Sequence, residues 1–554
     1  MSKPGQAFSR EQGIFIRARR SSAPELATTS KPRVLVFGLD GATWGLLDKL
    51  VDDGTMPSLA SLRRSSVYGD LISTVPPDTP TGWGSLARGI SPGGTGVFGF
   101  HRPGESVDSF KPVASFEARG ASFPELLEKE GLSVVLINFP TVSFPLKIHG
   151  PVLGDILSPS RNLVSPPSLA AEAPFRDYRV FPSVPALPDT DKYLRDIRKL
   201  EATRFACAQR LFESEWDLFF VMFSATDWIQ HELFSDLLHG QGQHLPEAKT
   251  VYHDLDGYLG WFASRLAERD SIIVVSDHGF EERSGMLSVN LWLAEHGYLA
   301  QKFNSEQVLL RAGPEQVRVP GWILNRLYGN RYLWSLSAKL ARTLFGQSLD
   351  VRSFNVPPDP EKTLAYYVEF DWGIYLNSKR RFERGLVDGD QEKGVAMNIV
   401  ADLRRLVDSG LLRDVKLGSE VYRGSYADAG PDVVIYPSEY SFCGLSSQLV
   451  SRFPPGGRYM MRNAHSMNGI YLVRNQHVQP GRNGEREILD IFPTVLNLFG
   501  VSVPSQAEGR SMVSSTRPDS QPPLAQPTEP SQNRVVTEDE EEEIMSRLKR
   551  LGYF

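Results

Sequence analysis

Cysteine is nearly absent from this chain of 554 residues, which contains only Cys207 and Cys443. Two cysteines exclude a disulfide framework and a cysteine cluster that binds metal. Long apolar runs are also missing, because no stretch approaches the roughly 20 apolar residues that a membrane helix needs. The apolar run at 13–16 is too short for a secretory signal and is followed by arginines. These absences predict a cytoplasmic protein, with an organellar address as the alternative.

An excess of positive charge is absent as well. The 60 basic residues face 66 acidic ones, which gives a net charge of −6. Such a chain has no overall basic field for nucleic acid, so binding to a duplex is not expected. The hydrophobic fraction of 41% and the charged fraction of 23% are those of an ordinary globular protein.

Continuous apolar runs alternate with helical patterns along most of the chain. Runs of this kind are typical of buried parallel strands. They lie at Val34–Leu39, Ser133–Asn138, Leu218–Phe223 and Ile272–Val275, with a weaker one at Asp432–Tyr436. Helical patterns occupy Ala248–Leu266 and Ala396–Val407. The alternation predicts an α/β fold, namely a doubly wound, mostly parallel sheet flanked by helices.

The remaining segments predict the domain organisation. Residues 1–30 are expected to form a disordered arm, and residues 31–505 the main body. Two long tracts, about 150–212 and 281–365, are expected to form caps over the carboxyl edge of the sheet.

The end of the chain reads as a linker and a final helix. The tract 506–534 is rich in Pro, Ser and Gln and predicts a linker. In the final segment, 535–554, Thr537 and Glu540 form a capping box and Ile544 and Leu548 share one face, which predicts a C-terminal helix.

A basic segment, 322–345, has a leucine-rich side and no acidic residue. We interpret it as a cap helix that covers the core. Contact with a membrane surface or a lipid head group is the less favoured alternative. Liposome co-sedimentation would distinguish the two.

Metal-binding side chains follow two of the predicted strands. The segment 275–279 reads Val-Ser-Asp-His-Gly, and adjacent Asp277 and His278 at a strand end can both reach one zinc or manganese ion. In the segment 223–231, Asp227 and His231 would lie on one face of a helix, close enough to share an ion. In both cases a helix-capping Asp beside an incidental His is the alternative.

Asp40 and His465 are weaker signals. Asp40 follows the first strand, but an Asp before Gly is often only turn chemistry. His465 lies in a polar turn that enters another apolar run, and alone it would be unremarkable.

A hydroxyl at a predicted helix start is the candidate nucleophile. Pro80 suits the first helical position, which would make Thr79 the N-cap. Threonine can serve there simply as a cap. A helix N-terminus also attracts phosphate, and a hydroxyl bound to a metal as well would ionise easily and could attack phosphorus. Thr81 and Ser85 suit this role less because they fall inside the helix.

Taken together and in this order, these elements resemble the alkaline phosphatase superfamily, particularly its type I phosphodiesterase / nucleotide pyrophosphatase branch. The segment 76–85, Pro-Pro-Asp-Thr-Pro-Thr-Gly-Trp-Gly-Ser, is similar to the nucleophile segment of a bacterial and archaeal subgroup. The ending 547–554, Arg-Leu-Lys-Arg-Leu-Gly-Tyr-Phe, is similar to the tail of that subgroup. The likeness covers roughly 33–130, 215–300 and 365–505.

The resemblance implies an alkaline phosphatase-like fold and a set of roles. It implies a phosphoric ester hydrolase of the phosphodiesterase, phosphatase or nucleotide pyrophosphatase type, with a phospho-threonine intermediate on Thr79. Two divalent cations are implied, zinc first, with manganese or iron as alternatives. One would be held by Asp227, His231 and His465. The other would be held by Asp40, Asp277 and His278, together with Thr79. The expected partner is a small phosphate ester.

The chain also departs from that branch. Gly82 stands where nucleotide pyrophosphatases usually have an Asn that contacts a phosphate oxygen. Arg88-Gly89 replaces their Thr-Gly, and Thr95-Gly96 replaces their His-Gly. These changes remove no predicted metal ligand, but they weaken the expectation that nucleotides are the substrate.

Other functions fit less well. The Cys/Ser-x-Pro-x-Arg motif of sulfatases is missing around Thr79, cofactor-independent phosphoglycerate mutases use serine in another context, and phosphoethanolamine transferases need a membrane segment. A phosphotransferase or mutase of the same superfamily is the nearest alternative. From a different class, an inactive metal-binding regulatory protein is less expected, because the nucleophile and all six ligands are present.

Overall fold

A ten-stranded sheet forms the centre of the described part of the chain. The computed structural model describes residues 32–107, 109–114, 118–140, 148–300, 307–312, 315–320, 358–368, 372–444, 448–454, 460–514 and 537–551. The strands of the main sheet are β1 (Val34–Leu39), β2 (Val67–Ile72), β5 (Val134–Ile137), β6 (Val152–Leu153), β7 (Val164–Ser165), β8 (Leu218–Phe223), β9 (Ser271–Val275), β21 (Asn468–Arg474), β22 (Gly481–Arg482) and β23 (Arg486–Glu487). Their order is β22-β2-β21-β9-β1-β8-β5-β6-β7, and β23 pairs with β2.

The middle of this sheet is parallel. β9, β1, β8, β5 and β6 run in one direction, whereas β21 is antiparallel to both β9 and β2. All residues of β1, β8 and β9 are buried, as expected for strands with helices on both faces. The predicted fold, a mostly parallel sheet flanked by helices, is confirmed.

Alternate side chains of β1 point into two different cores. Leu35 and Phe37 pack against one helical layer, and Val34 and Val36 pack against the other. The first layer contains α1 (Trp44–Asp52), α2 (Pro57–Arg63), α7 (Thr190–Phe212), α8 (Ala225–His239) and α9 (Leu245–Ala263). The second contains α3 (Thr79–Arg88), α5 (Phe123–Lys129) and α15 (Ile491–Leu498).

α3 lies close against β1 because Gly38 leaves room for it. A Cβ at Gly38 would lie 2.9 Å from the indole of Trp83, which α3 presses onto the strand. This contact fixes the start of α3 above the carboxyl end of β1.

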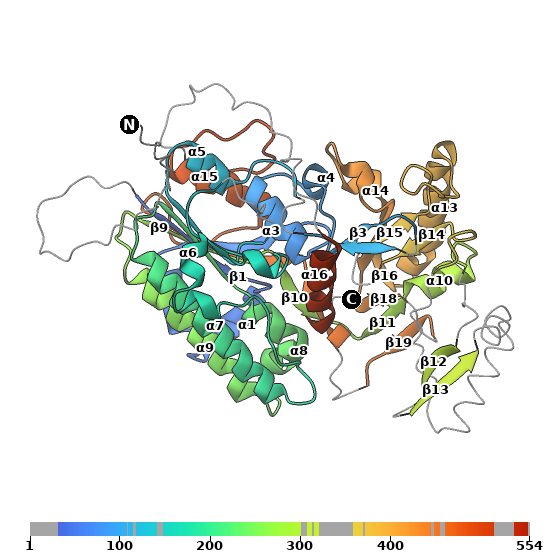
Figure 1. Ribbon diagram of the computed structural model, residues 1–554, viewed down its shortest axis with the longest axis horizontal. Helices are drawn as coiled ribbons and strands as arrows, with labels where there is room; N and C mark the ends of the chain where they lie inside the picture. Colours follow the sequence, from blue (N-terminus) through green and yellow to red (C-terminus); the bar gives the residue numbers. More distant parts are fainter. Residues whose placement is uncertain are drawn as a thin grey trace, which may run out of the picture.

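A second lobe, on the right of Figure 1, has its own hydrophobic core. It contains a four-stranded antiparallel sheet in the order β14-β15-β17-β16 and a three-stranded sheet in the order β18-β11-β19. These strands are β14 (Ala365–Tyr367), β15 (Gly373–Leu376), β16 (Leu412–Leu417), β17 (Val433–Pro437), β11 (Gly285–Ser288), β18 (Tyr440–Cys443) and β19 (Val450–Arg452). The helices are α10 (Val289–Glu295), α13 (Gly389–Asp408) and α14 (Gly418–Val421).

Small elements complete the described chain. They are β3 (His101–Pro103), β4 (Phe110–Pro112), β10 (Gly279–Glu282), β12 (Gln307–Ala312), β13 (Glu315–Pro320), β20 (Asn463–Ser466), α4 (Pro92–Thr95), α6 (Pro167–Ala170), and the 3-10 turns at Ser160–Asn162, Phe175–Asp177, Ala427–Ala429, Met460–Arg462 and Ile488–Asp490. Of these, the β10–β20 ribbon matters most, because it runs beside the candidate site.

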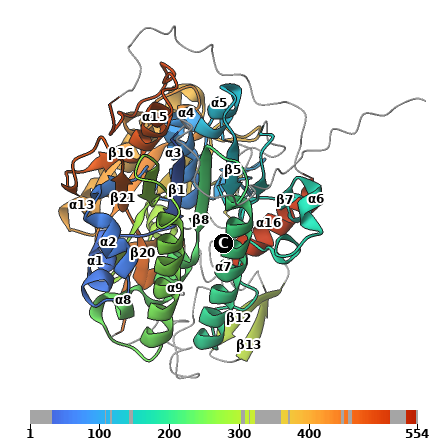
Figure 2. The ribbon, with the colours of Figure 1, turned by 90° about the vertical axis from the view of Figure 1, so that its left-hand side faces the viewer.

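The tracts expected as caps are built differently. Within 150–212, β6 and β7 belong to the main sheet and α7 covers one of its faces (Figure 2). Within 281–365, β11 and α10 belong to the second lobe, which continues to β19. β17, whose sequence was expected to form another strand of the main sheet, lies in this lobe as well.

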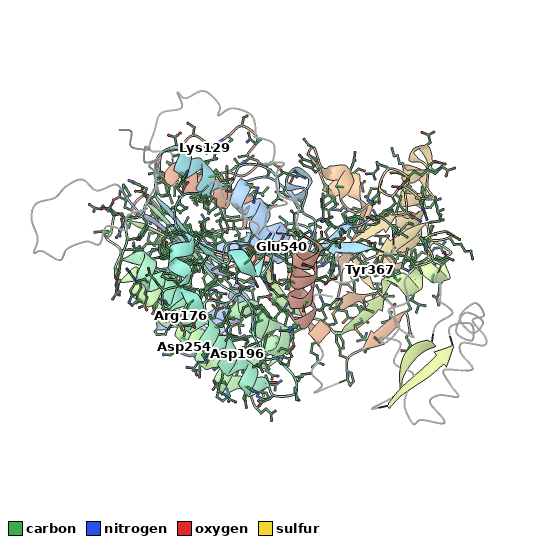
Figure 3. All side chains as sticks on the ribbon, viewed as in Figure 1. Lys129, Arg176, Asp196, Asp254, Tyr367 and Glu540 are labelled. Carbon is green, nitrogen blue, oxygen red and sulfur yellow. The ribbon has the colours of Figure 1, made fainter. Side chains whose placement is uncertain are left out.

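The C-terminal helix α16 (Glu538–Leu551) packs onto Phe100, Ala114, Ile156 and Leu157. Thr537 and Glu540 form the predicted capping box, and Ile544 and Leu548 are fully buried. Glu540, labelled in Figure 3, pairs with Arg161 at 2.7 Å. This helix therefore closes one side of the main lobe.

Several sequence predictions fall outside the described residues. They are the arm at 1–30, the basic segment 322–345, most of the linker 506–534 and the last three residues of the tail. In the described part of the chain, no helix combines the length and the apolar character needed to cross a membrane.

Candidate metal centre

Three buried side chains gather where β1 and β9 end. β1 is followed directly by Asp40, and β9 is followed after one residue by Asp277 and His278. The strands are parallel neighbours, so their carboxyl ends meet at one edge of the sheet. His278 Nε2 lies 3.4 Å from Asp277 Oδ2 and 3.9 Å from Asp40 Oδ1. We call Asp40, Asp277 and His278 the strand-end group.

A tight turn holds the strand-end group in place. The backbone N–H of Gly41 donates to Asp277 Oδ1 at 3.2 Å. Gly41 has a φ of +67°, and a Cβ there would lie 2.7 Å from the ring of Phe280. Glycine is therefore required at this position by both the backbone conformation and the space.

A second group forms beside the first, from α8 and β20. Asp227 and His231 lie one turn apart on α8, and Asp227 Oδ1 is 3.4 Å from His231 Nε2. His465 Nε2 lies 3.2 Å from Asp227 Oδ1 and 3.0 Å from His231 Nε2. We call Asp227, His231 and His465 the two-histidine group.

Antiparallel pairing brings His465 to this position. β10 begins directly after His278, and β20 pairs with it so that His465 lies opposite Phe280. The rings of His278 and His465 stack at 3.8 Å between centroids with an angle of 25°. The two groups are thus in direct contact through one histidine of each.

Buried polar side chains form hydrogen bonds with the backbone beside the metal-binding residues. Glu201 of α7 accepts hydrogen bonds from the N–H groups of Ser224 and Ala225, both at 2.9 Å, where α8 begins. Thr226 donates to the carbonyl of Asp40. Asn463 donates to the carbonyl of His231 at 3.0 Å. Sequence patterns gave no signal for these supports, because each joins elements that are distant in the chain.

The two groups differ in their electrostatics. Burial, and then the charge of Asp277, raises the pKa of Asp40 well above its usual range, and burial raises the pKa of Asp277 to about 7. Burial alone would also raise the pKa of Asp227, but the charges and hydrogen bonds of His231 and His465 hold it well below its usual range.

The histidines differ in the same way. Burial lowers the pKa of His278 well below its usual range, and the charge of His465 acts in the same direction. Burial also opposes the charged form of His465, yet hydrogen bonds to Asp227 and Asp78 prevail and raise its pKa to about 10. His278 is therefore a neutral imidazole, the form that binds metal.

Both groups fit a divalent cation. Donor atoms about 2.0–2.1 Å from a tetrahedral zinc are separated by about 3.3 Å, and the two-histidine group has separations of 3.0, 3.2 and 3.4 Å. In the strand-end group, Asp40 Oδ1, Asp277 Oδ2 and His278 Nε2 are buried with no hydrogen-bond partner among the described residues. Buried polar atoms of this kind need a partner, and a cation supplies one. The donors in each group lie within 4.8 Å of one another.

Thr79 lies on the first turn of α3. The residues just before it contact the two-histidine group, and a residue just after it lies against the strand-end group. The preceding residues, Pro77 and Asp78, contact His465 of the two-histidine group. Three residues after Thr79, a Cβ at Gly82 would lie 2.9 Å from Asp277 Cβ of the strand-end group. Thr79 itself is buried, with 4% of its surface exposed.

The start of α3 differs by one residue from the predicted one. Asp78 is the N-cap and Thr79 is already helical, because the extended conformation that precedes a helix belongs to Asp78. Thr81 and Ser85 lie inside the helix, as predicted.

Sequence reasoning missed Asp78 as a member of the centre. Its Oδ1 lies 3.2 Å from His465 Nδ1. The only local signal is an acidic residue before a helix, which predicts a cap. Nothing in the spacing connects it to a histidine 387 residues away.

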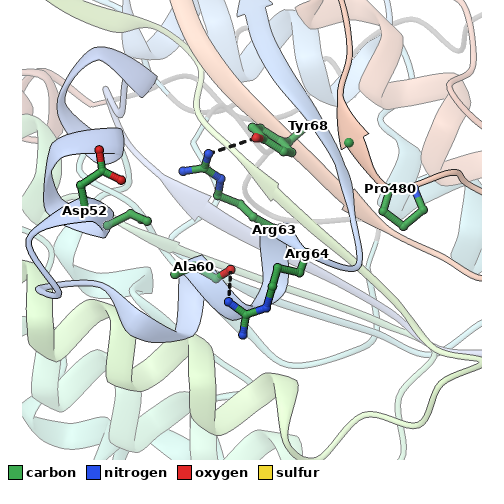
Figure 4. A pocket seen from close by; sticks show the side chains of 8 residues that line it. Asp52, Ala60, Arg63, Arg64, Tyr68 and Pro480 are labelled. Atoms are coloured by element: carbon green, nitrogen blue, oxygen red, sulfur yellow. Dashed lines mark hydrogen bonds between the residues drawn. The ribbon is translucent and has the colours of Figure 1, made fainter.

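A surface hollow of about 410 Å³ lies elsewhere (Figure 4). It is lined by Arg63, Arg64, Tyr68 and Pro480, among others, near the start of β2. β2 runs in the same direction as β1, so this hollow lies at the edge of the sheet opposite the metal centre. It contains none of the predicted site residues.

Comparisons with known proteins agree with this architecture. The family model of type I phosphodiesterase / nucleotide pyrophosphatase matches residues 34–330, more than half of the chain. This range includes Thr79 and all the gathered ligands except His465, which the structure adds. No curated protein sequence matches the chain.

Solved structures show the fold. The crystal structure of alkaline phosphatase PafA has a TM-score of 0.50 with 13% identity, covering 88% of this chain and 99% of that chain. Phosphonoacetate hydrolase from Sinorhizobium meliloti 1021 has a TM-score of 0.48 with 14% identity, covering 83% and 94%. Murine ectonucleotide pyrophosphatase / phosphodiesterase 5 has a TM-score of 0.44 with 13% identity, covering 85% and 95%. The match to PafA identifies the fold as alkaline phosphatase-like.

Proposed function

The chain belongs to the type I phosphodiesterase / nucleotide pyrophosphatase family, and on that premise we propose that it hydrolyses small phosphoric esters by means of Thr79 and two divalent cations. One observation carries the proposal. Two sets of metal-competent donors lie in contact through the stacked rings of His278 and His465, beside the turn that presents Thr79.

The strand-end group and the two-histidine group would each hold one cation, zinc first by the chemistry of their donors. When bound, such a pair lowers the pKa of a nearby hydroxyl and neutralises charge on phosphate oxygens. Membership of the family supports a phosphoric ester hydrolase. The metal pair and the intermediate described next are our proposal.

Thr79 would act as the nucleophile in two steps. Its Oγ gives up a proton and attacks phosphorus while the bond from phosphorus to the ester oxygen breaks. A phospho-threonine forms, and the leaving oxygen takes up a proton and departs as the alcohol. Water then attacks the same phosphorus, and the bond from phosphorus to Oγ breaks. The phosphate product leaves, and a proton from the water returns to the Thr79 oxygen. The N-terminal end of α3, ten residues long, adds a positive dipole on the side where the phosphate would lie.

The first test replaces the hydroxyl. We expect Thr79→Ala to reduce hydrolysis of aryl phosphate mono- and diesters by on the order of 10³-fold or more, because the nucleophile is lost. Both cations should stay bound, since their other donors are untouched. The assay uses a panel of such esters, after treatment with a chelator and return of zinc.

Thr81→Ala is the matched control. Thr81 lies on the same helix, is fully buried, and its hydroxyl has no hydrogen-bond partner among the described residues, so its loss should leave turnover nearly unchanged. Hydrolysis by Thr79→Ala at the rate of the unaltered protein would contradict the proposal. No turnover by the unaltered protein on any ester would favour the regulatory alternative.

A further inference from the structure

Asp78 occupies the N-cap of α3 but does not cap the helix. No side-chain capping hydrogen bond is formed there, and the N–H of Gly82 donates instead to the backbone carbonyl of Asp78 at 2.7 Å. Pro80 has no N–H to offer. The usual reason for an aspartate at a helix start is therefore missing.

The carboxylate of Asp78 faces the metal centre instead. Asp78 is 6% exposed, and its Oδ1 lies 3.2 Å from Nδ1 of His465. Its other oxygen, Oδ2, is buried with no hydrogen-bond partner among the described residues. The contact to His465 is thus its main polar contact in the described structure.

These contacts decide which nitrogen of His465 carries the proton. Nδ1 faces Asp78 Oδ1 and, at 3.1 Å, the carbonyl of Pro77, and both of these can only accept. In the neutral, metal-binding form of the ring the proton therefore belongs on Nδ1. Nε2, which faces Asp227 and His231, is then the nitrogen that can ligate a cation. The Nε2 atoms of His465 and His231 lie 3.0 Å apart, close enough for one cation to contact both.

We propose that Asp78 is a positioning residue, which fixes the ring of His465 as a ligand of the cation held by the two-histidine group. This inference rests on the proposed function, since it needs a cation there. Carboxylates that accept from the second nitrogen of a metal-bound histidine orient the ring and increase its basicity. Asp78 adjoins Thr79 in the chain, so the same link ties the nucleophile to the ligand.

The test measures zinc alone, on the full chain. The background variant Asp277→Asn removes a donor of the strand-end group, so that the two-histidine group dominates binding. Adding Asp78→Asn or Asp78→Ala should weaken zinc binding there about 10–100-fold, measured by competition with a chromophoric chelator. Asn keeps the size and one acceptor, so Asp78→Asn should have the smaller effect and should fold if Ala does not.

Asp388→Asn is the control. Asp388 is also the N-cap of a helix without a side-chain capping bond, on α13, where it pairs with Lys379 at 2.6 Å. The Asp388→Asn variant should leave zinc binding unchanged. This control separates a positioning role of Asp78 from a general effect of altering a helix start.

The outcomes separate the two proposals. Two zinc ions in the unaltered protein, with unchanged zinc affinity in both Asp78 variants, would overturn the role of Asp78 alone. Fewer than two ions in the unaltered protein would overturn the metal pair and this inference together. Weakening confined to the two-histidine group supports both.

Discussion

The strand-end group and the two-histidine group have the same number of donors but opposite proportions of carboxylates and imidazoles. The first has two carboxylates and one neutral imidazole, and all three side chains are at most 5% exposed. The second has one carboxylate and two imidazoles, and the side chain of His231 is 19% exposed. Without a cation, the first group is self-repulsive and the second is held together by attraction between Asp227 and its histidines.

This difference in composition determines how strongly each group depends on a bound cation. A proton on His465 can partly replace a cation in the two-histidine group, because the imidazolium lies beside Asp227. In the strand-end group, the repulsion between Asp40 and Asp277 is relieved by a proton, but Asp277 loses its proton at about pH 7, well below the pH at which His465 does. The strand-end group should therefore depend more strongly on its metal.

The largest expected effect is a pair of opposite changes in the metal-free protein. Asp277→Asn should raise its free energy of unfolding by on the order of 2 kcal/mol at pH 8, because a desolvated charge is removed. His465→Ala should lower it by about 3 kcal/mol, because Asp78 is left buried without its partner. Urea denaturation with a chelator present would measure both.

Asp256→Asn is the control for this pair. Asp256 is equally buried but accepts from the N–H groups of Ser58 and Leu59, both at 2.8 Å. Its replacement should destabilise the protein. If Asp277→Asn destabilised it as well, the electrostatic difference between the groups would be refuted.

The next effect is on how the stability of the metal-free protein depends on pH. The pKa of Asp277 in the folded, metal-free protein is raised to about 7, so the folded state holds more protons than the unfolded state from about pH 4 to 7. Its contribution to stability falls as pH rises through that window. His465, raised to about 10, contributes stability that is present below pH 6.5 and is lost as pH rises toward 10.

The stability of the metal-free protein should therefore fall from pH 5 to pH 9, by up to about 1.4 kcal/mol per pH unit for each proton released. Zinc should flatten the curve by replacing those protons. Asp277→Asn should remove mainly the part below pH 7. Denaturation curves with zinc and with chelator would test this, and metal-free stability that rises with pH would contradict it.

The smallest expected effect comes from Gly82→Ala. Its Cβ would lie 2.9 Å from Asp277 Cβ and 3.2 Å from the Asp277 carbonyl, so it should shift the strand-end group at a cost of about 1 kcal/mol. Zinc binding should weaken at that group and stay unchanged at the two-histidine group. Gly257→Ala on α9, where a Cβ would meet nothing within 4 Å, is the control. Equal weakening at both groups would remove the distinction between them.

Local sequence patterns predicted those ligands that a strand end or a single helix places in the centre. Asp40, Asp277 and His278 follow buried apolar strands, and parallel strands bring their ends together. The spacing of Asp227 and His231 predicted one face of a helix, and α8 places them 3.4 Å apart.

Long-range pairing was beyond those patterns. His465 arrives through the β10–β20 ribbon, and only the family resemblance connected it to the other ligands. Asp78 has the sequence context of a cap, and only the approach of β20 reveals its partner. The same limit explains why α7 was expected in a cap and β17 in the main sheet. The apolar pattern of an element does not say which core the element joins.

Anomalous diffraction from zinc-loaded crystals tests the central claim most directly. We expect two peaks roughly 3.5–4 Å apart, one within Asp227, His231 and His465 and one within Asp40, Asp277 and His278. A single peak, or two peaks with His465 ligating neither, would contradict the central claim.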